Sequence, residues 1–259
     1  MIDVLAAEWH KLRSVRSTYY ALGVALAGLL AGAAIAWSAA AAFDGASPEG
    51  RLRSSVSYIE EVLVIIPQLC LGILGVLSIT SEYTTGTIRA TMMAVPRRWP
   101  VVAGKAALLA GLAAVTGPLV VFGTYFACRS LIGGRFNGVY LTPLAHRLPV
   151  LIVTGLSVVV FALVGLGLAT VLRSTAGSIV ILIGLVYVIP IVAINLPAPW
   201  DARLGSVLLT NLPREITGTL DANTVFDTLL PPVAAAAVML AYALLPLAAG
   251  ALLVRRRDL

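Results

Sequence analysis

The sequence predicts an all-α integral membrane protein with six transmembrane helices and an N-terminal amphipathic interfacial helix. Of its 259 residues, 59% are hydrophobic and 12% are charged, whereas a soluble domain carries about 25% charged residues. A soluble fold would leave much of this apolar surface in water. The apolar residues also fall in runs near the length of about 20 residues that a spanning helix needs.

Six apolar runs meet this length, and none of them contains a formal charge. This matters because a charge at the bilayer centre costs about 2.5–3.5 kcal/mol on insertion scales. The six predicted spans are Tyr19–Ala42, Val62–Thr80, Ala106–Cys128, Leu148–Leu172, Gly177–Leu196 and Val233–Val254. Four prolines inside them favour kinks: Pro67, Pro118, Pro190 and Pro246. The spacing Gly28-x-x-x-Gly32 suits a helix dimer contact, although chance matches are common in a chain this rich in glycine and alanine.

Residues 1–18 precede the first run and predict a helix that lies on the membrane surface. Ile2, Leu5, Trp9 and Leu12 recur at helical spacing and form one apolar stripe. Trp9 would then sit at the depth of the lipid headgroups, with Lys11 and Arg13 as further headgroup or partner contacts. A plain charged leader is the alternative. A cleaved signal peptide fits less well, because the run from Tyr19 is too long for a signal core.

The distribution of charge predicts the orientation. An even number of spans places both termini on one side, and basic residues favour the cytoplasmic side. Eleven of the 18 basic residues and four of the 12 acidic residues belong to the side of the termini. The basic residues of that side are Lys11, Arg13, Arg16, Arg89, Arg97, Arg98, Lys105, Arg173, Arg255, Arg256 and Arg257. Both termini and the polar segment 81–105 are therefore expected in the cytoplasm.

Three outer segments separate the spans on the other side: Phe43–Glu61, Arg129–Arg147 and Pro197–Pro232. The third contains short apolar stretches, which predict re-entrant or interfacial helices within residues 197–232. Glu60 and Glu61, at the start of the second span, are interpreted as solvated acids that suit a helix start. The alternative is a proton- or cation-binding site. Gln68 and Asn195 either hydrogen-bond between helices, the favoured interpretation, or line a substrate pathway.

The sequence lacks the motifs of phosphate-binding, metal-binding and catalytic sites. Lys11 and Lys105 are the only lysines, and neither follows the glycine pattern of a phosphate-binding loop. His10 and His146 are far apart and belong to no metal motif, and Cys70 and Cys128 sit in or beside apolar runs. No catalytic centre, metal or bound cofactor is expected. The scattered basic residues favour a membrane over nucleic acid as the partner. Residues 1–259 are therefore interpreted as a single membrane domain.

The polar segment 81–105 between the second and third spans carries the strongest functional signal. Ser81 is expected to cap a short helix, with Glu82 in its first turn. Ile88, Met92 and Val95 would form its apolar face, and Pro96 and Pro100 would end or turn the chain. Arg97 and Arg98 would meet headgroups or a partner's acids. The alternative is a solvated loop.

Two stretches resemble the type 2 ATP-binding-cassette (ABC) permease family. One is Glu82-Tyr83-Thr84-Thr85-Gly86-Thr87-Ile88-Arg89 after the second of six spans. The other is the N-terminal segment from Glu8 to Thr18, which is similar to the family's connecting helix, especially in actinobacterial-type members. The resemblance extends to the number and order of the spans and to the long segment between the fifth and the sixth.

This resemblance implies a permease subunit in a bacterial cell membrane that pairs with a second copy as a homodimer. Two copies of a separate P-loop ATPase would bind ATP and magnesium. The resemblance assigns ATPase coupling to Glu82, Tyr83, Gly86, Thr87, Ile88 and Arg89. It implies export of a lipophilic or amphipathic substrate, in a family that moves drugs, antibiotics, lipids or polysaccharides. The alternatives are a proton- or ion-coupled carrier using Glu60, Glu61 or Gln68, and a membrane scaffold that transports nothing.

Overall fold

A computed structural model describes residues 2–87, 99–218 and 230–256, which form helices and connecting turns and contain no strand. Their longest helices are α2, α5, α7, α8 and α13. The elements are α1 (Ile2–Ser14), α2 (Arg16–Gly45), α3 (Pro48–Arg53), α4 (Ile59–Leu63), α5 (Ile65–Thr84), α7 (Trp99–Ile132), η1 (Phe136–Leu141), α8 (Leu144–Leu172), α9 (Thr175–Ile183), η2 (Gly184–Val188), α10 (Ile189–Ile194), α11 (Trp200–Val207), α12 (Leu212–Thr217) and α13 (Pro232–Arg256).

Six helical stretches of the described residues are long and apolar enough to cross a membrane, which confirms the predicted number. They are Arg16–Gly45, Ile59–Thr84, Trp99–Ile132, Leu144–Leu172, Thr175–Ile194 and Pro232–Leu253. Several of these helices extend well past the apolar runs. A helix ends where its backbone hydrogen bonds end and not where apolar residues end, so α7 carries Lys105 and Arg129 and α8 carries Arg147.

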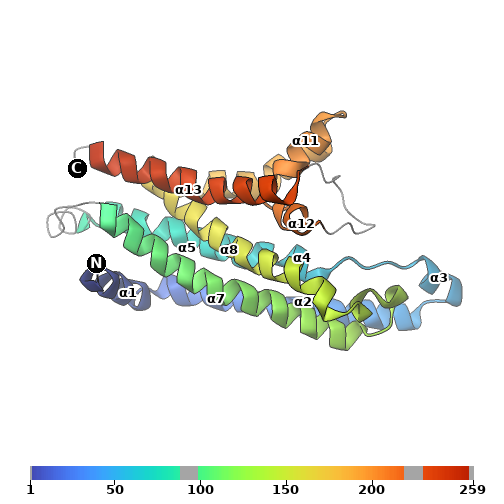
Figure 1. The fold of residues 1–259 in the computed structure, drawn as a ribbon. Helices are drawn as coiled ribbons and strands as arrows, with labels where there is room; N and C mark the ends of the chain where they lie inside the picture. Colours follow the sequence, from blue (N-terminus) through green and yellow to red (C-terminus); the bar gives the residue numbers. More distant parts are fainter. Residues whose placement is uncertain (1, 88–98, 219–229, 257–259) are drawn as a thin grey trace.

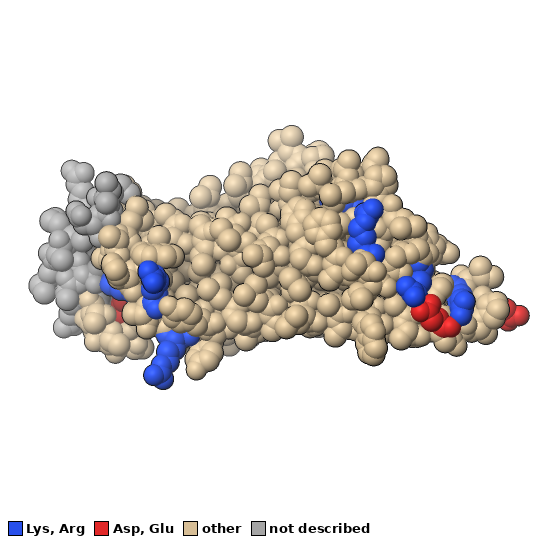
Figure 2. Space-filling model, turned by 90° about the horizontal axis from the view of Figure 1, so that it is seen from below, with Lys and Arg blue, Asp and Glu red and all other residues tan. Residues whose placement is uncertain are grey.

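The long helices run side by side along one axis (Figure 1). One end of the bundle, here called the terminal end, contains α1, the ends of α5 and α8, and the beginning of α7. The opposite, distal end holds α3, α4 and α12. On the face drawn in Figure 2, charged side chains gather toward the two ends, with a broad band free of them between. This distribution is the one that a bilayer requires, because charge belongs outside its hydrocarbon core.

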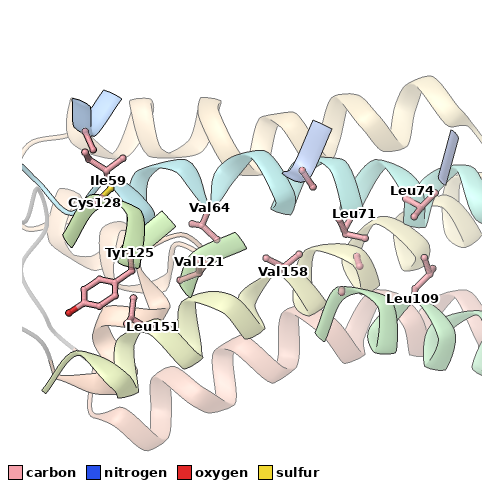
Figure 3. Close-up of a cluster of buried hydrophobic side chains, with 14 of the residues drawn as sticks. Ile59, Val64, Leu71, Leu74, Leu109, Val121, Tyr125, Cys128, Leu151 and Val158 are labelled. Carbon is pink, nitrogen blue, oxygen red and sulfur yellow. The ribbon is translucent and has the colours of Figure 1, made fainter. Parts of the chain in front are cut away.

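The largest core cluster lies between α5, α7 and α8. Leu71 and Leu74 from α5, Leu109 from α7 and Val158 from α8 are almost fully buried. Their side chains point into the space between these helices (Figure 3). Small residues bring the backbones close together, as in other membrane bundles.

Glycines set the closest helix contacts. A Cβ atom added at Gly165 would lie 2.0 Å from the carbonyl oxygen of Gly72, so α5 and α8 nearly touch there. A Cβ atom added at Gly32 would lie 2.5 Å from the Thr124 side chain, and one added at Gly28 would lie 3.4 Å from the Ile66 side chain. The Gly28-x-x-x-Gly32 pair therefore packs against α7 and α5 of its own chain, and its proposed dimer role is not supported by these contacts.

Two helix breaks follow from proline. Pro67 has no N–H to bond the Leu63 carbonyl, and α4 and α5 are separated at Val64. Similarly, the fifth spanning stretch passes through the π-helical turn η2 just before Pro190. Pro118 and Pro246 lie inside the continuous helices α7 and α13.

The outer segments contain more helix than predicted. Arg129–Arg147 was expected as a loop, but α7 runs to Ile132 and α8 begins at Leu144, with η1 between them. The described part of residues 197–232 contains the short helices α11 and α12. That helices of this segment are re-entrant or interfacial stays a prediction. Leu208 and Leu209, between them, are buried.

Candidate functional site

The N-terminal helix α1 packs against α7 and the start of α2. Leu12, from the predicted apolar stripe, packs against the main core. However, Trp9 is 43% exposed, whereas Glu8 is 4% exposed. The prediction of an apolar stripe on one side missed this carboxylate, because a buried ion pair leaves no signature in helical spacing.

Glu8 belongs to a cluster of four charged side chains at the terminal end, here called the terminal ion cluster: Glu8 and Lys11 from α1, Glu82 from α5 and Lys105 from α7. The Lys11 ammonium lies 2.7 Å from Glu8 Oε1 and 2.8 Å from Glu82 Oε1. The Lys105 ammonium lies 2.8 Å from the same Glu82 oxygen, pairs with Glu8 Oε2, and donates to the Ser78 carbonyl at 3.0 Å. The cluster thus joins three helices that are distant in sequence.

The four members differ in burial. The side chains of Glu8, Glu82 and Lys105 are 5%, 7% and 4% exposed, whereas that of Lys11 is 41% exposed. Burial alone would lower the pKa of Lys11, but hydrogen bonds and the charges of Glu82 and Glu8 outweigh it and raise this pKa. Lys11 therefore remains an ammonium at neutral pH, and two carboxylates meet two ammonium groups.

The position of Glu82 corrects the prediction for this segment. Glu82 and Ser81 lie in the last turn of α5, so Ser81 does not cap a new helix; its carbonyl accepts the Thr85 N–H at 3.1 Å. Gly86 follows with φ +72°, the left-handed conformation that ends many helices and that glycine adopts without strain. The glycine of the motif thus follows the end of α5, one turn after the buried Glu82.

The other predicted coupling residues have separate surroundings. Tyr83 is half-buried, and the Arg173 guanidinium lies 5.2 Å from its ring centroid. Thr87 is exposed, and its hydroxyl lies 2.9 Å from that of Thr85. Ile88, Arg89, Arg97 and Arg98 lie outside the described residues. Of the predicted headgroup residues, Trp9 and Arg13 are exposed, whereas Lys11 is engaged in the terminal ion cluster.

A second cluster, the distal ion cluster, shows that Glu60 and Glu61 are not solvated. Their side chains are 0% and 7% exposed. Arg147 pairs with Glu61 and lies 3.5 Å from Glu60, and Arg214 lies 2.7 Å from Glu61 Oε2. Both acids stand in the first turn of α4, as predicted. The structure also pairs them with α8 and α12, two elements whose proximity the sequence does not reveal.

Aromatic side chains complete the distal ion cluster. The Tyr140 hydroxyl donates to Glu60 Oε2 at 3.0 Å and accepts the Ile59 N–H at 2.9 Å. Burial and the nearby Glu60 charge raise the pKa of Tyr140, so this phenol keeps its proton. The Arg147 guanidinium also lies 3.3 Å from the centroid of the Tyr58 ring, a cation–π contact.

Gln68 and Asn195 have different roles. Gln68 is 1% exposed, and its amide donates to Ser157 of α8 at 2.7 Å, which confirms the interhelical bond. Asn195 is exposed and donates to the Ile191 carbonyl one turn earlier at 2.7 Å, so its predicted interhelical bond is wrong. Among the described residues, no group of three His, Cys, Asp or Glu side chains could hold a metal ion.

Six helical stretches of spanning length, with buried ionic contacts between some of them at each end, define a polytopic helical membrane protein. Residues 4–191 match the ABC-2 family transporter protein family, a range that includes most of α1, both ion clusters except Arg214, and most of the fifth spanning stretch. The chain belongs to this family. It is a membrane subunit that lacks the ATPase domain, and the family implies an ATPase partner. A comparison with curated proteins found no match.

Proposed function

We propose that the chain is the permease of an ABC exporter and moves a lipophilic or amphipathic substrate outward by alternating access. It would act as a homodimer with two copies of an ATPase, which would bind ATP and magnesium. Both termini and segment 81–105 would face the cytoplasm of a bacterial cell. The terminal ion cluster is the observation that carries this proposal. It joins α1 to the end of α5 and to the start of α7, the two helices that contain the ends of segment 81–105.

The cluster offers a route for mechanical coupling. A partner that displaces α1 or segment 81–105 would act on Lys11 and Glu8, or on the end of α5. The two lysines would pass this displacement to α5 and α7, because each bridges Glu8 and Glu82. Glu82 would therefore connect the helices inside the permease and would not itself contact the ATPase. Gly86 and Thr87 would lie nearer to the ATPase.

The distal ion cluster weighs against a proton-coupled carrier. A carrier acid must accept and release a proton during transport, whereas Glu61 is held between the guanidinium groups of Arg147 and Arg214. Pairing with arginine favours the ionised form of a carboxylate.

Glu82→Gln in the permease, reconstituted in vesicles with its ATPase, tests the coupling role. Glutamine preserves the size of the side chain and removes the charge that both lysines contact. We expect substrate-stimulated ATP hydrolysis and transport to fall about tenfold or more, because a charged hydrogen bond contributes about 1.5–3 kcal/mol. The control is Glu49→Gln, at an exposed acid in α3. Wild-type stimulation and transport in a folded Glu82→Gln protein would contradict the coupling role.

A further inference from the structure

A cavity of about 490 Å³ lies beside the terminal ion cluster, between α1, the start of α2, α5 and α7. This volume falls within the range of about 300–1,000 Å³ that is typical of small-molecule sites. Its apolar walls include Leu12, Val15, Leu74, Leu77 and Leu109. Such a wall suits a hydrocarbon chain.

The polar end of the cavity has an unused hydrogen-bond acceptor. Glu82 lines the cavity and is 6% exposed. Its Oε1 atom accepts from Lys11 and Lys105, but its buried Oε2 atom has no hydrogen-bond partner among residues 2–87, 99–218 and 230–256. A buried acceptor without a donor costs about 1–3 kcal/mol, and more when it is charged. The site therefore favours an occupant with an N–H donor.

The cavity lies at the level where the spanning helices end. α2 begins at Arg16, α5 ends at Thr84 and α7 begins at Trp99. Trp9 and Trp99 are exposed, as are Arg13 and Arg16, which adjoin the lining residues Ser14, Val15 and Ser17. Exposed tryptophan and arginine beside span ends are typical of the headgroup region. An occupant from this region would place its chain on the leucines and its head near Glu82.

We propose that this cavity binds a phospholipid of the surrounding leaflet whose head carries a primary ammonium, such as phosphatidylethanolamine. The ammonium donates a hydrogen bond to Glu82 Oε2, and the lipid phosphate faces the exposed Arg13 and Arg16. The acyl chain lies along Leu74, Leu77 and Leu109. The lipid thereby fills the space between α1 and α5. The binding site does not rest on the transport role, because no ATPase residue contributes to it.

Native mass spectrometry of the purified full chain, titrated with defined lipids, tests the site. Palmitoyl-oleoyl phosphatidylethanolamine is compared with the phosphatidylcholine of the same chains, whose quaternary ammonium has no N–H. We expect the ethanolamine lipid to bind about tenfold more tightly, as loss of one charged hydrogen bond implies. Two variants probe the two ends of the cavity: Glu82→Gln removes the charged acceptor, and Leu77→Trp fills the space.

Leu244→Trp is the matched control, because Leu244 is 58% exposed on α13. Both cavity variants should weaken binding of the ethanolamine lipid by about tenfold, whereas the control should not. Equal binding of the two lipids would overturn the role of the ammonium. Equal binding in wild type, both cavity variants and the control would overturn the site itself.

Discussion

Glu82 connects three helices through one carboxylate oxygen. Its Oε1 atom meets Lys11 from α1 and Lys105 from α7, while Glu82 itself belongs to α5. The two lysines differ in solvent exposure, at 41% for the Lys11 side chain and 4% for that of Lys105. The cluster therefore contains a natural comparison between a surface partner and a buried partner of the same acid.

Lys105→Met should destabilise the protein far more than Lys11→Met. Removing the buried Lys105 leaves uncompensated buried charge, which costs about 3–5 kcal/mol. Lys11 is 41% exposed, so water screens its contacts and can replace them in part. The same lysine-to-methionine change in one cluster makes each variant the control for the other. The free energy of unfolding in mixed detergent micelles measures both. Equal losses would mean that burial does not determine the strength of these contacts.

At the scale of the element, α5 and α8 form the closest pair of helices. Gly72 and Gly75 of α5 face the backbone of α8 at Phe161 and Ala162, and Gly165 of α8 faces Gly72 in return. A side chain on either surface would push the helices apart. Because Gln68 also bonds Ser157 across this contact, separation of the two helices would break a buried hydrogen bond as well.

Gly165→Ala should destabilise this helix pair. Its Cβ atom would lie 2.0 Å from the Gly72 carbonyl oxygen, a backbone atom that cannot move aside alone. Overpacking of this kind costs about 1–3 kcal/mol or more. Gly111→Ala is the matched control, because its Cβ atom meets nothing within 4 Å in a helix of similar length, and alanine favours helix by up to about 1 kcal/mol. Thermal unfolding in detergent should separate the two, and a similar melting temperature for both variants would refute the close contact.

The sequence predicts elements better than it predicts contacts. Six apolar runs were enough to locate the six spanning stretches, because the bilayer imposes a length and excludes charge. The third run is shorter than the helix α7, because Lys105 and Arg129 end the apolar run but lie inside the helix. Glu60 and Glu61 were interpreted as solvated, because their partners Arg147 and Arg214 lie 86 and 153 residues from Glu61. Such pairs depend on tertiary packing, which a local pattern does not encode.

At the scale of the whole molecule, the two ion clusters occupy opposite ends of the bundle. The terminal ion cluster lies where α5 ends and α7 begins, and the distal ion cluster lies where α4 and α8 begin. Between them, the face drawn in Figure 2 has a broad band without charged side chains. The bundle is therefore held by ionic contacts near its two ends and by small-residue packing between them.

The excess of basic residues on the side of the termini predicts that the terminal end faces the cytoplasm. Single cysteines at His10→Cys in α1 and Ser55→Cys near α3 test this, because both positions are exposed and lie at opposite ends of the bundle. In intact cells a membrane-impermeant maleimide should label Ser55→Cys, whereas His10→Cys should react only after the membrane is opened. The unmodified chain is the control, since Cys128 is buried and Cys70 lies within α5. Labelling of His10→Cys in intact cells, with Ser55→Cys protected, would reverse the orientation and place segment 81–105 away from a cytoplasmic ATPase.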